Sequence, residues 1–153
     1  MLKRAAAVGA AAVLAWGLGT TDANATSIYV HFKNKLTGRC LDYRADYGVY
    51  ATDCNQGGYQ TWLVNEASFQ LSAMRQNAGD RLCLVARNGA ATMKPCLADD
   101  PAALWIISPT TVGFQLVNNV TDTCLGEGNT AKHLVKLVPC SGGSSQQWEE
   151  QDA

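Results

Sequence analysis

The feature that most constrains the fold of this chain is a short pattern that recurs three times along it. In each copy a Cys-Leu pair is followed by a second cysteine and then by a tryptophan. Trp62, Trp105 and Trp148 stand 43 residues apart, so the copies share one period. A period of roughly 20 to 50 residues indicates stacked copies of one supersecondary unit, and we predict that the tryptophans pack in a common core. The predicted repeats span about residues 26–66, 67–109 and 110–153.

The six cysteines divide equally among the repeats, two to each. The repeat period selects one bridge within each copy from the pairings that six cysteines allow. The expected disulfides are Cys40–Cys54, Cys83–Cys96 and Cys124–Cys140. A zinc site is the competing interpretation, but the chain has no Cys-x-x-Cys motif and only His31 and His133 as nitrogen ligands. We expect neither a metal nor any other cofactor.

The N-terminal part of the chain has the pattern of a secretory signal peptide. Two basic residues precede an apolar run from Ala5 to Leu18, and a small-x-small cleavage sequence ends at Ala25. We therefore expect residues 1–25 to be removed and residues 26–153 to form a secreted, extracellular domain. Export into an oxidising compartment also favours the three disulfides.

The charge of the chain excludes two classes of partner. Its formal charge is −1 at pH 7, and its basic residues form no run along the sequence. Nucleic acids and anionic membrane surfaces are bound through clustered positive charge, so we expect neither as a partner. No segment beyond the expected signal peptide is apolar over the roughly 20 residues that a membrane-spanning helix needs.

Short segments rich in β-branched and aromatic residues alternate with turn signals through the rest of the chain. Asn88-Gly89 is one such signal, because this pair favours the two-residue turn of a β-hairpin. No segment shows helical periodicity. Four short strands per repeat indicate an all-β fold with a closed sheet, which has no exposed edges. The predicted strands cover residues 27–32, 39–44, 49–53, 61–65, 69–74, 82–86, 91–94, 104–107, 114–118, 123–125, 133–138 and 148–150.

The complete motif resembles the ricin B-chain-like (R-type) β-trefoil lectin family. In the first repeat it runs from Cys40 to Asp42, continues at Cys54 and ends in a Gln-x-Trp sequence from Gln60 to Trp62. The other repeats keep this motif with some losses, and the resemblance extends over the whole chain after the expected signal peptide. It implies a β-trefoil of three four-stranded repeats that binds a carbohydrate or glycan.

In that family each repeat can carry a sugar pocket. An aspartate two residues after the first cysteine accepts hydrogen bonds from neighbouring sugar hydroxyls. The glutamine of Gln-x-Trp, and usually an asparagine before it, help to fix the pocket. The resemblance therefore places a carbohydrate site at Asp42 and Gln60. Tyr59 stands where the family usually has the asparagine, and we include it among the expected site residues. A carboxylate suits this task, because it can accept two hydrogen bonds side by side.

The aromatic residue on which the sugar usually stacks is missing from its family position in the first repeat. That position, two residues before the second cysteine, is Thr52. Tyr50 lies on the same face of the predicted strand, and Tyr47 lies in the adjacent turn. A tyrosine ring offers an apolar plate to the C–H face of a sugar, so we expect Tyr47 or Tyr50 to replace the missing aromatic.

The second and third repeats have lost most of the sugar-binding pattern. In the second repeat Val85 replaces the aspartate and Ala103 replaces the glutamine. In the third repeat Gly126 replaces the aspartate, although Gln146 is kept. We expect both repeats to serve as scaffold.

The polar residues of the first repeat also have structural interpretations. Gln60 could hydrogen-bond a loop backbone, as Gln146 could in the third repeat, and Asp42 could cap a turn. With two pockets lost, a β-trefoil that binds a protein partner, such as a protease inhibitor, is the second hypothesis. Its binding loops would be residues 55–59, 97–102 and 126–132.

An enzyme is the third hypothesis. The sequence has no Gly-x-Ser-x-Gly motif, and no metal-ligand spacing surrounds His31 or His133, both of which fall on predicted strands. We therefore expect no catalytic residue.

Overall fold

The computed structural model describes residues 27–65, 70–73, 81–128 and 131–153. The expected signal peptide and the predicted turn after the fifth strand lie outside these ranges. All twelve predicted strands are present, so the all-β fold class is confirmed. Helix in the described ranges is limited to two single 3-10 turns, η1 (Pro101–Ala103) and η2 (Ser144–Gln146). None of the described segments forms a helix long and apolar enough to cross a membrane.

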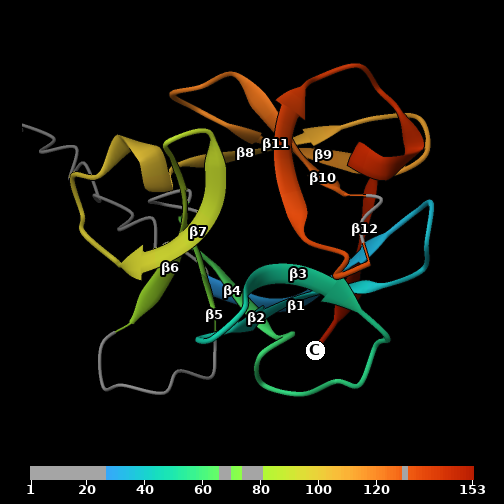
Figure 1. Cartoon of the computed structure of the whole chain (residues 1–153), viewed down its shortest axis with the longest axis horizontal. Helices are drawn as coiled ribbons and strands as arrows, with labels where there is room; N and C mark the ends of the chain where they lie inside the picture. The colour runs from blue at the N-terminus through green and yellow to red at the C-terminus, as the bar shows by residue number, and fades with distance from the viewer. Residues whose placement is uncertain (1–26, 66–69, 74–80, 129–130) are drawn as a thin grey trace, which may run out of the picture.

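Six strands, two from each repeat, form a closed antiparallel barrel (Figure 1). They are β1 (Ser27–Asn34), β4 (Trp62–Asn65), β5 (Gln70–Ala73), β8 (Trp105–Pro109), β9 (Phe114–Asn118) and β12 (Trp148–Asp152). β1 pairs with β4 and β12, β4 pairs with β5, and β9 pairs with β8 and β12. A bridge between Gln70 of β5 and Leu104, next to β8, closes the ring.

The other six strands form three hairpins, one in each repeat. They are β2 (Cys40–Arg44) with β3 (Gly48–Thr52), β6 (Leu82–Arg87) with β7 (Ala90–Pro95), and β10 (Thr123–Glu127) with β11 (Val135–Pro139). β3, β7 and β11 contact one another around a common centre (Figure 1). Asn88 and Gly89 have φ angles of 53° and 74°, which confirms the predicted two-residue turn between β6 and β7.

Each of the three motif tryptophans is held in the core by the same hydrogen bond. Trp62, Trp105 and Trp148 are 0%, 1% and 0% exposed. The indole Nε1 of each donates to the carbonyl oxygen of the leucine in the Cys-Leu pair of its own repeat, at 2.9 to 3.0 Å. The acceptors are Leu41, Leu84 and Leu125. The recurring motif thus encodes one contact, which ties the hairpin of each repeat to its barrel strand.

The three predicted disulfides are all present. In each repeat the first cysteine lies in the first strand of the hairpin, and its partner lies one or two residues after the end of the second strand. The bridged cysteines are 14, 13 and 16 residues apart in the sequence. In the chain-entropy model a bridge that closes a loop of this length contributes about 3 kcal/mol to stability. No described cysteine is free.

One sequence prediction about the third repeat is wrong. His133 does not lie on a strand: its φ angle is 50°, a left-handed conformation, and β11 begins only at Val135. The physical reason is a contact with the first repeat, because the His133 carbonyl oxygen accepts a hydrogen bond from the Ala51 backbone N–H at 2.9 Å. The segment before β11 therefore packs against β3 instead of extending its own strand.

The loop predicted over residues 126–132 also begins later than expected, because β10 continues to Glu127. The Glu127 side chain is 3% exposed and has three partners. Its carboxylate accepts a hydrogen bond from the Thr37 hydroxyl and lies 3.5 Å from the Arg39 guanidinium and 3.2 Å from His133 Nδ1. The contacts with Thr37 and Arg39 join the third repeat to the β1–β2 turn of the first.

Candidate functional site

Asp42 lies at the centre of β2, directly opposite Tyr50 of β3. Directly opposed residues of an antiparallel pair project from the same face and stand about 5 Å apart at their Cβ atoms. Thr52, at the family position of the aromatic, lies opposite Cys40 instead. The hairpin register therefore places Tyr50, and not Thr52, beside the Asp42 carboxylate.

Gln60 is fully buried and connects Asp42 to the loop that follows the first disulfide. Its Nε2 donates to Oδ2 of Asp42 at 2.9 Å and to the carbonyl oxygen of Asp53 at 3.0 Å. Its Oε1 accepts the backbone N–H of Asn55 at 2.9 Å. One amide thus orients the carboxylate and shapes the loop at the same time.

Gln146 makes the same loop contacts in the third repeat. Its Nε2 donates to the carbonyl oxygen of Pro139 at 2.8 Å, and its Oε1 accepts the backbone N–H of Ser141 at 2.9 Å. A loop-holding role therefore describes both glutamines. They differ in the remaining partner, which is a carboxylate for Gln60 and the Gln115 side chain, at 3.1 Å, for Gln146.

Two of the three candidate tyrosines lie together. The ring centroids of Tyr47 and Tyr50 are 4.9 Å apart with an interplanar angle of 82°, a favourable edge-to-face contact. The Tyr47 hydroxyl donates to the carbonyl oxygen of Lys132 at 3.0 Å, and Lys132 Nζ lies 5.2 Å from the Tyr47 ring centroid. The Arg44 guanidinium lies 5.9 Å from the same centroid. Tyr59, in contrast, is half-buried and packs against the main core.

The electrostatics of the site follow from burial. Asp42 is 4% exposed, and burial raises the pKa of its carboxyl group. Hydrogen bonds from the Gln60 side chain, the Tyr43 backbone and the Tyr50 side chain oppose this rise. Burial, and then the negative charge of Asp42, raise the pKa of Tyr50 to about 12. Tyr50 therefore keeps its proton at physiological pH and donates it in a hydrogen bond to the Asp42 carboxylate.

We expect Asp42→Asn to be more stable than the wild-type protein at neutral pH. A raised folded-state pKa means that the folded protein binds this proton more tightly than the unfolded chain does. The resulting stabilisation is fully present below the ordinary value of 3.8 and is lost as the pH rises through the folded-state pKa. Asparagine removes this dependence, so urea unfolding should show a gain in stability at pH 7 that disappears in acid.

Asp122→Asn is the matched control for this comparison. Asp122 is exposed and has a φ angle of 50°, a conformation that asparagine tolerates well. It makes the same change of charge without burial, so its stability should follow the wild-type pH dependence. An Asp42→Asn variant that is no more stable than the wild type at neutral pH would contradict the expectation.

In the second repeat the equivalent positions are filled by apolar atoms. Val85 and Ala103, both 0% exposed, pack with Cys83 and the partly buried Cys96 into a small cluster separate from the main core. The side chains that replaced the aspartate and the glutamine are therefore apolar and buried, and neither can hydrogen-bond a sugar.

Sequence reasoning missed Asp100, which holds the corresponding loop of the second repeat in place of a glutamine. Its Oδ1 accepts the backbone N–H of Ala102 at 3.1 Å and so caps η1, while its Oδ2 lies 2.6 Å from Arg87 Nη2. The available signal was the Asp100-Pro101 sequence, because an aspartate before a proline is typical of the start of a helical turn.

In the third repeat the surroundings of Gly126 leave little space for an aspartate side chain. A Cβ atom built at this glycine would lie 3.3 Å from Val138 Cγ2 and 3.5 Å from Gln146 Cγ. The first contact is tight, so a longer side chain would have to displace its neighbours. Among the described repeats, only the first combines a carboxylate, a buried amide and a neighbouring tyrosine at this position. No group of three or more His, Cys, Asp or Glu side chains in the described ranges is placed to hold a metal ion.

The six-stranded barrel, the three hairpins and the repeated tryptophan–leucine bond define a β-trefoil. A family model described as the ricin-type beta-trefoil lectin domain matches residues 28–148. The chain therefore belongs to the ricin-type β-trefoil lectin family. No curated protein matches the sequence significantly.

Several solved structures have a similar fold. The designed threefold-symmetric protein ThreeFoil is 20% identical with a TM-score of 0.69, over 82% of this chain and 99% of that one. The C-half of the earthworm R-type lectin, solved with GalNAc, is 14% identical with a TM-score of 0.65, over 82% and 99%. The GlcNAcα1-4Gal-releasing endo-β-galactosidase from Clostridium perfringens is 13% identical with a TM-score of 0.69, over 82% of this chain and 33% of that enzyme. At these identities the similarity shows the fold alone.

Proposed function

We propose that this protein is a secreted lectin that binds a carbohydrate non-covalently through its first repeat. The observation that carries the proposal is the Asp42 carboxylate, oriented by Gln60 and standing beside Tyr50. Membership of a lectin family supports carbohydrate binding. The similar earthworm lectin, which was solved with GalNAc, also supports a glycan as the ligand.

Each group has a distinct role in this proposal. The Asp42 carboxylate accepts hydrogen bonds from two neighbouring sugar hydroxyls, which a bidentate acceptor suits. The Tyr50 hydroxyl, which donates its proton to the Asp42 carboxylate, can accept a hydrogen bond from a sugar hydroxyl. The Tyr47–Tyr50 pair offers aromatic surface to the C–H face of the sugar. Gln60 holds the carboxylate in place before the ligand arrives, which reduces the entropy lost on binding.

Secretion and the absence of catalysis are part of the same proposal. The N-terminal pattern of basic residues, apolar run and small-x-small sequence supports export, and three disulfides suit an oxidising compartment. Binding breaks no bond, so the site requires no general acid or base.

A glycan-array screen of the oxidised protein, run beside Asp42→Asn, tests the proposal. We expect the wild type to bind a defined set of glycans and the variant to lose most of this binding, about tenfold or more, because a charge-assisted acceptor becomes a neutral amide. Asp122→Asn should bind as the wild type does. Circular dichroism and urea unfolding test whether the variants remain folded.

The outcomes separate the lectin proposal from its alternative. Glycan binding that survives in Asp42→Asn would place the sugar site elsewhere on the molecule. No binding by either protein would contradict the lectin proposal and favour a trefoil that binds a protein, for which an inhibition panel of proteases is the next measurement.

A further inference from the structure

A second polar groove lies on the other side of Gln60 from Asp42. It consists of two adjoining hollows of about 370 and 360 Å³, each near the lower end of the roughly 300 to 1,000 Å³ range of ligand pockets. His31, Gln56 and Asp152 line both hollows, so the two are continuous. One end of the groove reaches the Cys40–Cys54 disulfide and the other reaches Tyr29.

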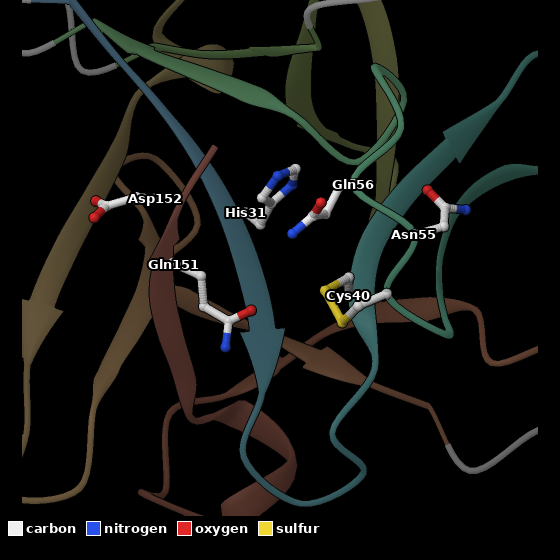
Figure 2. Close-up of a pocket in the computed structure, with 7 residues that line it drawn as sticks. His31, Cys40, Asn55, Gln56, Gln151 and Asp152 are labelled. Atoms are coloured by element: carbon white, nitrogen blue, oxygen red, sulfur yellow. A yellow bond between two sulfur atoms is a disulfide. The ribbon is translucent and has the colours of Figure 1, made fainter.

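The register of β1 and β12 builds the floor of this groove. His31 pairs directly with Gln151, so both side chains project from the same face of the sheet. Figure 2 shows His31 directed from β1 toward Gln56, which belongs to the loop after the disulfide, while Asp152 points away from them. The groove therefore lies between β1, β12 and the loop that follows the first disulfide.

His31 presents one unused nitrogen to the groove. Its Nδ1 lies 3.0 Å from the carbonyl oxygen of Gln60 and must donate its proton there, because a carbonyl oxygen can only accept. In the neutral imidazole Nε2 is then an acceptor, and it has no hydrogen-bond partner among the described residues. Gln60 thus orients Asp42 through its side chain and His31 through its backbone.

Gln56 supplies a second unused polar group. Its φ angle is 55°, a left-handed conformation that is uncommon for a residue other than glycine and costs free energy. In this conformation its side-chain amide turns toward His31 (Figure 2). No described residue forms a hydrogen bond with that amide, so its donor and its acceptor are both free for a ligand.

The chemistry of the groove selects a class of ligand. No lysine or arginine lines either hollow, which disfavours an anion. Asp152, which lines both hollows, adds a carboxylate that can accept hydrogen bonds from hydroxyl groups. The imidazole and amides disfavour an apolar ligand, because burying them without partners is costly. Tyr29, which is 50% exposed, adds an aromatic plate. Free acceptors, free donors and an aromatic plate match the hydroxyls and C–H face of a neutral sugar.

We propose that the groove between His31, Gln56 and Tyr29 is a second saccharide-binding site, which takes a neutral sugar unit of an oligosaccharide. This proposal rests on the proposed lectin function but not on the Asp42 site. Two sites on one chain bind a multivalent glycan far more tightly than either site alone. The groove thereby offsets the loss of the sugar pockets in the second and third repeats.

The double variant Tyr29→Ala/Gln56→Ala tests the proposal, because both side chains are exposed and their removal should leave the fold intact. The probes are neutral oligosaccharides selected on the array and their component monosaccharides, titrated by calorimetry. We expect the double variant to bind the oligosaccharide about tenfold more weakly than the wild type. Asn119→Ala, which removes an exposed amide from the third repeat, should have no effect.

The result in Asp42→Asn separates the two sites. A residual oligosaccharide affinity in that variant, lost when Tyr29→Ala/Gln56→Ala is added, supports the groove. In the wild type, the imidazole nitrogen resonances of His31 should shift on addition of the oligosaccharide.

Unchanged binding in the double variant overturns the proposal of a groove site and leaves the Asp42 site standing. Binding lost in the double variant but kept in Asp42→Asn supports the groove and overturns the Asp42 site. No glycan binding by the wild type overturns both.

Discussion

Trp148→Ala should remove most of the stability of the domain. Trp148 is 0% exposed, and large-to-small changes of a buried tryptophan cost about 3 to 5 kcal/mol. The change also leaves the Leu125 carbonyl oxygen without its indole donor, which adds about 1 to 3 kcal/mol. A domain is stable by only about 5 to 15 kcal/mol, so urea unfolding of this variant should show a small or absent native baseline.

The threefold repeat supplies matched controls for this prediction. Trp62→Phe, Trp105→Phe and Trp148→Phe keep most of the ring volume but remove the same hydrogen bond, so their losses should agree within about 1 kcal/mol. Leu97→Ala changes a side chain that is 55% exposed and should alter stability by less than about 0.5 kcal/mol. Widely unequal losses among the three phenylalanine variants would show that the repeated bond is not an equivalent contact in each repeat.

The disulfides should contribute unequally although they close similar loops. Replacing Cys83 and Cys96 with alanine should cost about 3 kcal/mol from loop closure and about 1 kcal/mol more from lost packing. The additional loss arises because this bridge packs against Val85 and Ala103 in an apolar cluster. Unfolding of the purified variant in urea, with the remaining bridges oxidised, measures the difference.

The other two bridges are the controls for this comparison. The first cysteine of each bridge is buried, but Cys54 and Cys140 are exposed, whereas Cys96 is partly buried. Alanine replacement of either of their pairs should therefore cost about 3 kcal/mol from loop closure and lose less packing than replacement of Cys83 and Cys96. Equal losses for all three bridges would mean that loop closure alone determines their contribution and that the cluster around Cys83 adds nothing.

Most of the fold could be predicted from the sequence because the repeat constrains it three times over. The period of the tryptophans, the cysteine pairs and the Asn88-Gly89 turn each indicated the same strand order. The errors concerned places where one repeat contacts another. His133 departs from the strand because its carbonyl oxygen binds the Ala51 backbone of a different repeat, and no local pattern in the sequence reports such a contact.

The candidate site was predictable only in part. The motif identified Asp42 and Gln60, and the two-residue alternation of a strand placed Tyr50 on the right face. The hydrogen bond between Gln60 and Asp42 spans 18 residues and depends on how the loop folds back over β2. Gln60 also donates a hydrogen bond to the Asp53 backbone, and Gln146 makes the equivalent bond to the Pro139 backbone in the third repeat. Gln60 therefore holds its own loop as well as the Asp42 carboxylate.

The sequence by itself determined the number of repeats, the disulfide pairing and the all-β class, because each depends on spacing along the chain. Only the tertiary structure decided what surrounds each polar group. Burial of Asp42, the contact between Tyr47 and Lys132, and the groove between His31 and Gln56 all join segments distant in sequence. Long-range packing sets the exposure, partners and pKa of a side chain, and these quantities determine what the site can bind.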